Sequence, residues 1–89
     1  MNEQSWAVNF HCDVEKEIRR LPRSYIRRIL EAIEGLGTDP KPLGSKRIED
    51  HDLWRIRVGV YRVLYEIDEE NRQINTYRIG HRKDVYRSL

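Results

Sequence analysis

The stretch from Leu53 to Tyr65 constrains the fold of this chain more than any other. It reads Leu-Trp-Arg-Ile-Arg-Val-Gly-Val-Tyr-Arg-Val-Leu-Tyr, so apolar residues alternate with arginines on both sides of Gly59. Alternation with a period of two predicts strands with one buried and one polar face, and the glycine predicts a tight hairpin between them. Arg55, Arg57 and Arg62 should therefore share one face of this hairpin.

Three guanidinium groups on one face repel each other unless an anion lies across them. The hairpin is therefore a candidate phosphate-binding surface. The alternative is an ordinary solvated face, because charged residues are common on the exposed side of an antiparallel sheet. Against this alternative, the arginines occupy the strand centres with no acidic cross-strand partner expected apart from Glu66, whereas surface strands more often mix charges of both signs. The net charge is only +2, but most of the 17 basic residues are arginines, which favour bidentate contacts with phosphate.

The first half of the chain predicts one strand and two helices. Residues 5–10 alternate as a short strand, with Trp6, Val8 and Phe10 on one face. An apolar stripe over residues 14–21 predicts a first helix, which a proline ends. A second stripe over residues 25–36 predicts a longer helix that two glycines, Gly35 and Gly37, should terminate.

The second half predicts strands. Residues 38–45 contain two prolines and a glycine and predict a loop, which we expect the polar residues 46–52 to continue. The arginine hairpin follows. Residues 73–80 predict a last strand whose alternation is irregular, which a β-bulge or burial on both faces would explain.

This order, β-α-α-β-β-β in 89 residues, predicts a single α+β domain over residues 1–89. We expect an antiparallel sheet with a two-helix hairpin packed on one face and the arginines on the other. Cys12 is the only cysteine, no apolar run approaches the length of a membrane span, and we expect no signal peptide. We therefore expect a cytoplasmic protein with no membrane partner.

Metal-ligating residue types occur in two places. His11 precedes Cys12, and the acidic segment 49–52 includes His51. No second histidine or cysteine pair stands at ligand spacing, so we expect no metal site and no cofactor. His81 precedes Arg82 and is the histidine nearest to the arginine group in the predicted sheet.

The chain resembles the RelE/ParE superfamily of bacterial toxins over nearly its whole length. The resemblance rests on the arginine hairpin, on the Pro-Lys-Pro-Leu loop at 40–43, and on Gly-His-Arg-Lys-Asp-Val-Tyr at 80–86. It implies the RelE-like fold and the toxin of a toxin–antitoxin system. RelE-type toxins cut messenger RNA on the ribosome without a metal, through attack of the 2′-hydroxyl on the neighbouring phosphate.

Carried over position by position, the resemblance implies two groups of residues. The catalytic group would be Arg62, Arg82 and Tyr86. The residues that bind RNA or the ribosome would be Arg55, Arg57, His81, Lys83 and Arg87.

The implied partners are a cognate antitoxin, the message in the ribosomal A site and 16S ribosomal RNA, with operator DNA reached only through the antitoxin. One alternative is a ParE-like toxin that poisons DNA gyrase and cuts no RNA. A third reading is an inactive domain that only pairs with an antitoxin or binds operator DNA.

Overall fold

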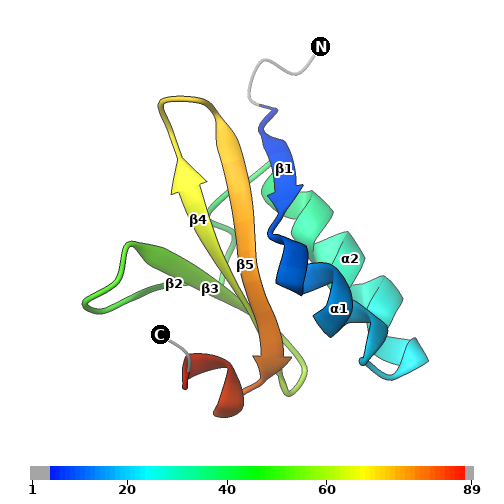
Figure 1. The fold of residues 1–89 in the computed structure, drawn as a ribbon. Helices are drawn as coiled ribbons and strands as arrows, with labels where there is room; N and C mark the ends of the chain where they lie inside the picture. Colours follow the sequence, from blue (N-terminus) through cyan, green and yellow to red (C-terminus); the bar gives the residue numbers. More distant parts are fainter. Residues whose placement is uncertain (1–4, 88–89) are drawn as a thin grey trace.

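A computed structural model describes residues 5–87 and contains one five-stranded sheet, two helices and a short 3-10 turn. The elements are β1 (Ala7–Phe10), α1 (Cys12–Arg19), α2 (Arg23–Leu36), β2 (Lys46–Ile48), β3 (Leu53–Val58), β4 (Tyr61–Asp68), β5 (Gln73–His81) and η1 (Asp84–Tyr86). The strand order is β1-β5-β4-β3-β2, and every neighbouring pair is antiparallel except β1 with β5. Both helices lie on one side of the sheet, while η1 lies on the other (Figure 1).

The predicted α+β class is confirmed, but the prediction of a loop over 46–52 is wrong in its first part. Lys46–Ile48 forms the edge strand β2, which pairs with β3. Only one of its three residues is apolar. Its extended conformation therefore depends on hydrogen bonds to β3, which local alternation does not reveal.

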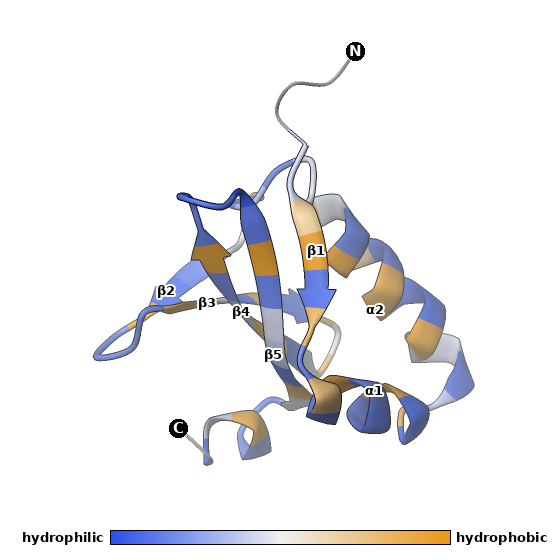
Figure 2. Cartoon of the chain, turned by 45° about the horizontal axis from the view of Figure 1, so that its top comes forward, coloured by the Kyte–Doolittle hydropathy of each residue, from blue (hydrophilic) through white to orange (hydrophobic). Residues whose placement is uncertain are grey.

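The helices follow their apolar stripes, which face the sheet in Figure 2. The His11 side chain caps α1 by accepting a hydrogen bond from the Asp13 amide, and Pro22 is the N-cap of α2. Helix α2 ends at Leu36, so Gly37 is its C-cap and Gly35 lies inside the helix. The Trp6 amide donates to the Gly37 carbonyl over 2.7 Å, and a Cβ on Gly37 would lie 3.0 Å from the Trp6 carbonyl oxygen. Glycine thus lets β1 approach the end of α2.

The main core lies between the helices and the sheet. It contains Val14 of α1, the inner face of α2, and alternate residues of β3, β4 and β5. Tyr65 is its largest fully buried side chain, and its hydroxyl donates to the Pro40 carbonyl over 2.7 Å. Trp6 and Val8 pack against this core, but Phe10 is 40% exposed. Phe10 shares their face, since it pairs with the buried Thr76, but it is more exposed because it ends an edge strand, where the chain turns into α1.

Strand β5 contains the predicted irregularity. Leu64 pairs with Arg78 and Tyr65 pairs with Thr76, so Tyr77 is an extra residue on β5. Strand β1 covers β5 only as far as Thr76. Beyond that point, Glu17 of α1 accepts a hydrogen bond from the Ile79 amide over 2.8 Å. A helix carboxylate thus replaces a neighbouring strand at this edge.

Neither described helix has the length and apolar character that crossing a membrane requires.

Candidate nucleic-acid interface

The hairpin of β3 and β4 has the register that the alternation predicts. Arg57 pairs with Arg62 and Arg55 pairs with Leu64, so the three arginines share one face, which we call the arginine face. Paired residues of an antiparallel sheet point to the same side. The turn needs Gly59, because its φ is +61° and a Cβ there would lie 2.5 Å from the Tyr25 hydroxyl.

Two further cations lie on this face, and the sequence reading missed both. Lys46 pairs with Arg55, and Arg78 pairs with Leu64. Lys46 was missed because β2 was read as a loop. Arg78 was missed because the bulge at Tyr77 reverses the alternation of β5. The irregular spacing of apolar residues in 73–80 was the signal that could have placed Arg78.

The arginine face carries positive charge that the protein does not neutralise. Among residues 5–87, no ion pair involves Arg55, Arg57 or Arg62, although other arginines pair with carboxylates. The Arg62 guanidinium donates hydrogen bonds to the Gly59 and Tyr61 carbonyls over 3.4 and 3.3 Å. One terminal nitrogen of Arg55 is buried and finds no hydrogen-bond acceptor among the residues that the structure describes. A buried donor without an acceptor is costly, and an anion bound here would supply one.

The C-terminal segment reaches the same end of the sheet. Gly80 pairs with Arg62, and Val85 of η1 packs over Gly80, so that a Cβ there would lie 3.4 Å from the Val85 Cβ. The Arg82 amide donates to the Val60 carbonyl over 2.9 Å. These contacts bring the segment that contains Arg82, Lys83, Tyr86 and Arg87 to the hairpin end of the arginine face.

Within this segment the side chains differ in burial. Arg82, Lys83 and Arg87 are exposed, while Tyr86 is half-buried. The Arg87 guanidinium lies 3.8 Å from the Asp84 carboxylate, so it is partly neutralised on its own turn. Arg82 and Lys83 make no ion pair within the described residues, which leaves their charge available to an anion.

His81 does not lie on the arginine face. It pairs with Tyr61, whose neighbours on the strand place it on the side of the helices. The His81 and Tyr61 rings meet edge to face at 6.0 Å, and Tyr61 in turn meets Tyr25 at 4.8 Å. His81 is therefore next to the arginine group along the sheet, but its side chain points to the other side, because its place in the pleat is opposite to that of Arg62.

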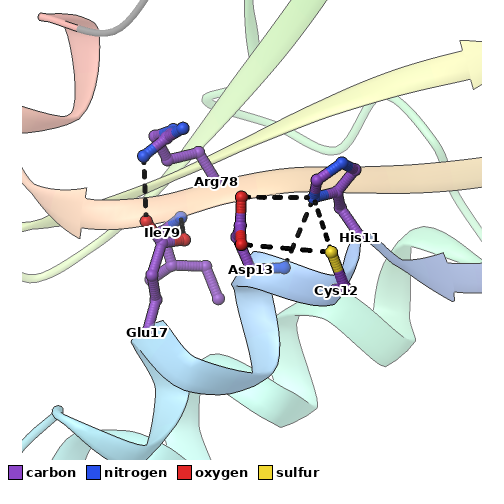
Figure 3. A network of polar contacts seen from close by, with 6 residues as sticks. All are labelled: His11, Cys12, Asp13, Glu17, Arg78 and Ile79. Carbon is purple, nitrogen blue, oxygen red and sulfur yellow. Dashed lines mark hydrogen bonds and ion pairs between the residues drawn. The ribbon is translucent and has the colours of Figure 1, made fainter.

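A second polar region occupies the other end of the same face. A hollow of about 350 Å³, which we call the distal hollow, is lined by His11, His51, Asp52, Leu53, Glu66, Tyr77 and Arg78. An ion pair holds Arg78 in place, because its guanidinium lies 3.3 Å from the Glu17 carboxylate of α1 (Figure 3). His11 and His51 are 40 positions apart in the sequence, so no local pattern predicts that they line one hollow.

The start of α1 brings three metal-ligating side chains together. The His11 Nδ1 atom lies 3.9 Å from the Cys12 sulfur and 3.8 Å from an Asp13 oxygen, as Figure 3 shows. This is the only such group of three among residues 5–87, so the acidic turn at 49–52 is not one. All three side chains are exposed, and the contacts cap the helix, which accounts for their proximity.

Comparisons with known proteins agree with this architecture. Residues 5–86 match the family described as "ParE toxin of type II toxin-antitoxin system, parDE". The toxin RelG of Mycobacterium tuberculosis is 31% identical over 84 residues, which cover 92% of this chain and 97% of RelG.

Two solved structures share the fold. An archaeal RelE–RelB complex from Pyrococcus horikoshii has a TM-score of 0.80 at 29% identity, over 89% of this chain and 97% of that one. A RelB–RelE antitoxin–toxin complex from Methanococcus jannaschii has a TM-score of 0.72 at 28% identity, over 91% and 98%. The chain therefore belongs to the RelE/ParE superfamily and is a toxin of a type II toxin–antitoxin system.

Proposed function

We propose that this toxin is a ribosome-dependent endoribonuclease that cleaves messenger RNA and so inhibits translation. The observation that carries the proposal is the direct pairing of Arg57 with Arg62, with no carboxylate in an ion pair with either among residues 5–87. Like charges directly opposite on neighbouring strands destabilise a sheet. A surface that keeps such a pair in its centre is suited to a polyanionic ligand.

The chemistry needs positive charge at one phosphate. In the proposed reaction the 2′-hydroxyl loses its proton and attacks the adjacent phosphorus. The bond to the 5′-oxygen breaks, and that oxygen takes up a proton. Negative charge grows on the other phosphate oxygens in the transition state, where preorganised guanidinium groups stabilise it. We assign this role to Arg62 and Arg82 and assign proton transfer or base stacking to Tyr86, with no role for a metal ion or cofactor.

The remaining assignments are binding roles. Arg55, Arg57, Lys83 and Arg87 would contact the phosphates of the message or of 16S ribosomal RNA in the A site. His81 lies on the other side of the pleat, so we assign it ribosome contact at the end of the sheet. We place the protein in the cytoplasm, where ribosomes and messages are.

We further propose that a cognate antitoxin controls the toxin. The similar proteins from P. horikoshii and M. jannaschii were crystallised as RelE–RelB complexes. Antitoxin carboxylates that pair with Arg55, Arg57 or Arg62 would neutralise the arginine face and block access to the ribosome. Operator DNA would be reached through the antitoxin.

A ParE-like activity, inhibition of DNA gyrase without RNA cleavage, is the second candidate, because the matching family is described by its ParE members. A translation extract separates the two. Primer extension on a reporter message should show cuts within codons for the wild-type toxin and none for Arg62→Ala. Intact message together with inhibited supercoiling by purified gyrase would favour the ParE-like activity.

A further inference from the structure

The distal hollow and the three arginines of the arginine face lie on the same side of the sheet, at opposite ends of it. Arg62, Leu64 and Glu66 alternate along β4, so all three point to this side. Arg62 and Glu66 are four positions apart, which is a distance of about 13 Å along the strand. An RNA strand that crosses the arginines therefore has a neighbouring nucleotide within reach of the hollow.

Aromatic rings form one wall of the hollow. Tyr77 is the bulged residue of β5 and is 39% exposed, so solvent reaches its ring. The His11 ring lies 6.0 Å from the Tyr77 ring with a tilt of 39°. Single-stranded RNA is commonly bound by stacking its bases on such exposed rings. The bulge thus presents an apolar plane on an otherwise charged face.

The floor carries an acceptor of hydrogen bonds. One carboxylate oxygen of Glu66 accepts from the Asn75 side-chain amide over 2.8 Å. The other oxygen has no hydrogen-bond partner within residues 5–87. The Asn75 oxygen in turn accepts from Asn9 over 3.2 Å, so this row of side chains holds Glu66 in place. The opposite rim is the β2–β3 turn, where Asp52 lies 3.6 Å from Arg47.

Cations border this acceptor on the side towards the arginine face. Arg78 is fixed by Glu17 and lines the hollow. A nucleotide that places its base against Tyr77 and Glu66 would leave its phosphate towards Arg78 and the arginine face. The two halves of the face thus offer separate sites for the base and the backbone of one strand.

We propose that the distal hollow binds a nucleobase of the RNA substrate and selects bases that carry an amino group over uracil. The amino group of cytosine, adenine or guanine donates to a carboxylate. Uracil presents carbonyl oxygens beside its single N–H, and these repel Glu66. The inference rests on the proposed function for its substrate, and it adds a base-selecting site to the phosphate site.

Two measurements test this. In the first, purified toxin acts on ribosomes programmed with messages that differ only by cytosine or uracil at one position of the A-site codon. At one of the codon positions, we expect the cytosine message to be cleaved about tenfold faster than the uracil message. This factor is the magnitude of one good base contact. Glu66→Gln should reduce this ratio to about threefold or less, because an amide also donates to uracil. Glu69→Gln, an exposed residue of the β4–β5 turn, is the matched control and should keep the ratio.

Two variants of Tyr77 test in the same assay whether a base stacks on its ring. Tyr77→Ala should slow cleavage of both messages about tenfold, whereas Tyr77→Phe, which keeps the ring plane, should cleave both at nearly the wild-type rate.

The second measurement does not depend on cleavage. Cytidine and uridine monophosphates are titrated into the isotope-labelled protein, and the amide signals around Glu66 and Tyr77 are followed by NMR. Cytidine monophosphate should shift these signals and bind at least about fivefold more tightly than uridine monophosphate. Such binding without any message cleavage would overturn the proposed ribonuclease and leave the base site standing. Cleavage with equal rates for both messages, and no nucleotide shifts in the hollow, would overturn the base site and leave the ribonuclease standing.

Discussion

Reversing one charge in the centre of the arginine face should make the protein more stable and less active at once. Arg57 is exposed and lies directly opposite Arg62. Arg57→Glu removes a repulsion and adds an attraction. Because each exposed cross-strand charge pair is worth about 0.2–1 kcal/mol, we expect a gain of about 1 kcal/mol in the free energy of unfolding. For a chain of this length that corresponds to a rise of about 5 °C in Tm.

The same substitution should lower message cleavage about a hundredfold, because a carboxylate would repel the RNA phosphates that the Arg57 guanidinium is proposed to bind. Thermal unfolding at low and at high salt, together with primer extension, measures both effects. Salt should shrink the stability gain, since it screens exposed charges.

Two control variants separate the effect of the Arg57–Arg62 pair from that of net charge. Arg57→Gln removes only the repulsion and should give about half of the gain. Arg27→Glu makes the same change in net charge on the outer surface of α2. It replaces the 3.5 Å pair with Glu31 by a repulsion between two carboxylates, so it should lower stability by about 0.4–1 kcal/mol and leave cleavage unchanged. A lower Tm for Arg57→Glu would show that the two arginines are not opposed in the folded protein. Wild-type cleavage by this variant would remove the arginine face from the proposed mechanism.

Four further predictions concern the site and the core. Arg62→Ala should keep the fold and lower the cleavage rate about a hundredfold or more, and a wild-type rate for the folded variant would refute the assignment of Arg62. Tyr86→Phe should lower the cleavage rate by about 10²–10⁴-fold only if Tyr86 transfers a proton. Burial raises the pKa of Tyr65 to about 12, so the unfolded chain releases this proton near its usual value of 10.0 while the folded protein keeps it. Stability should therefore fall by about 2–3 kcal/mol between pH 10 and 12, relative to Tyr65→Phe, in urea titrations; parallel pH curves for the two proteins would contradict this. The Thr76 hydroxyl is buried and has no hydrogen-bond partner in the described part of the chain, so Thr76→Val should raise the free energy of unfolding by about 1–2 kcal/mol, whereas Thr76→Ala should not. A destabilised valine variant would indicate a bond to an internal water.

Much of the architecture could be predicted from local spacing. The alternation around Gly59 correctly assigned Arg55, Arg57 and Arg62 to one face, because successive side chains of a strand must point to opposite sides. The two helices followed from apolar stripes in the same way. These patterns work because each depends on the geometry of one element and not on its neighbours.

Other features were decided only by the tertiary structure. Lys46 joins the arginine face because β2 pairs with β3, and Arg78 joins it because a bulge reverses the alternation of β5. His81 lies on the opposite side, since its register with Tyr61 overrides its nearness to Arg82 in the sequence. His11 and His51 line one hollow from two distant turns. Strand pairing, register and bulges are set by contacts between segments far apart in the chain, so local periodicity fixes which residues alternate but not which of them meet.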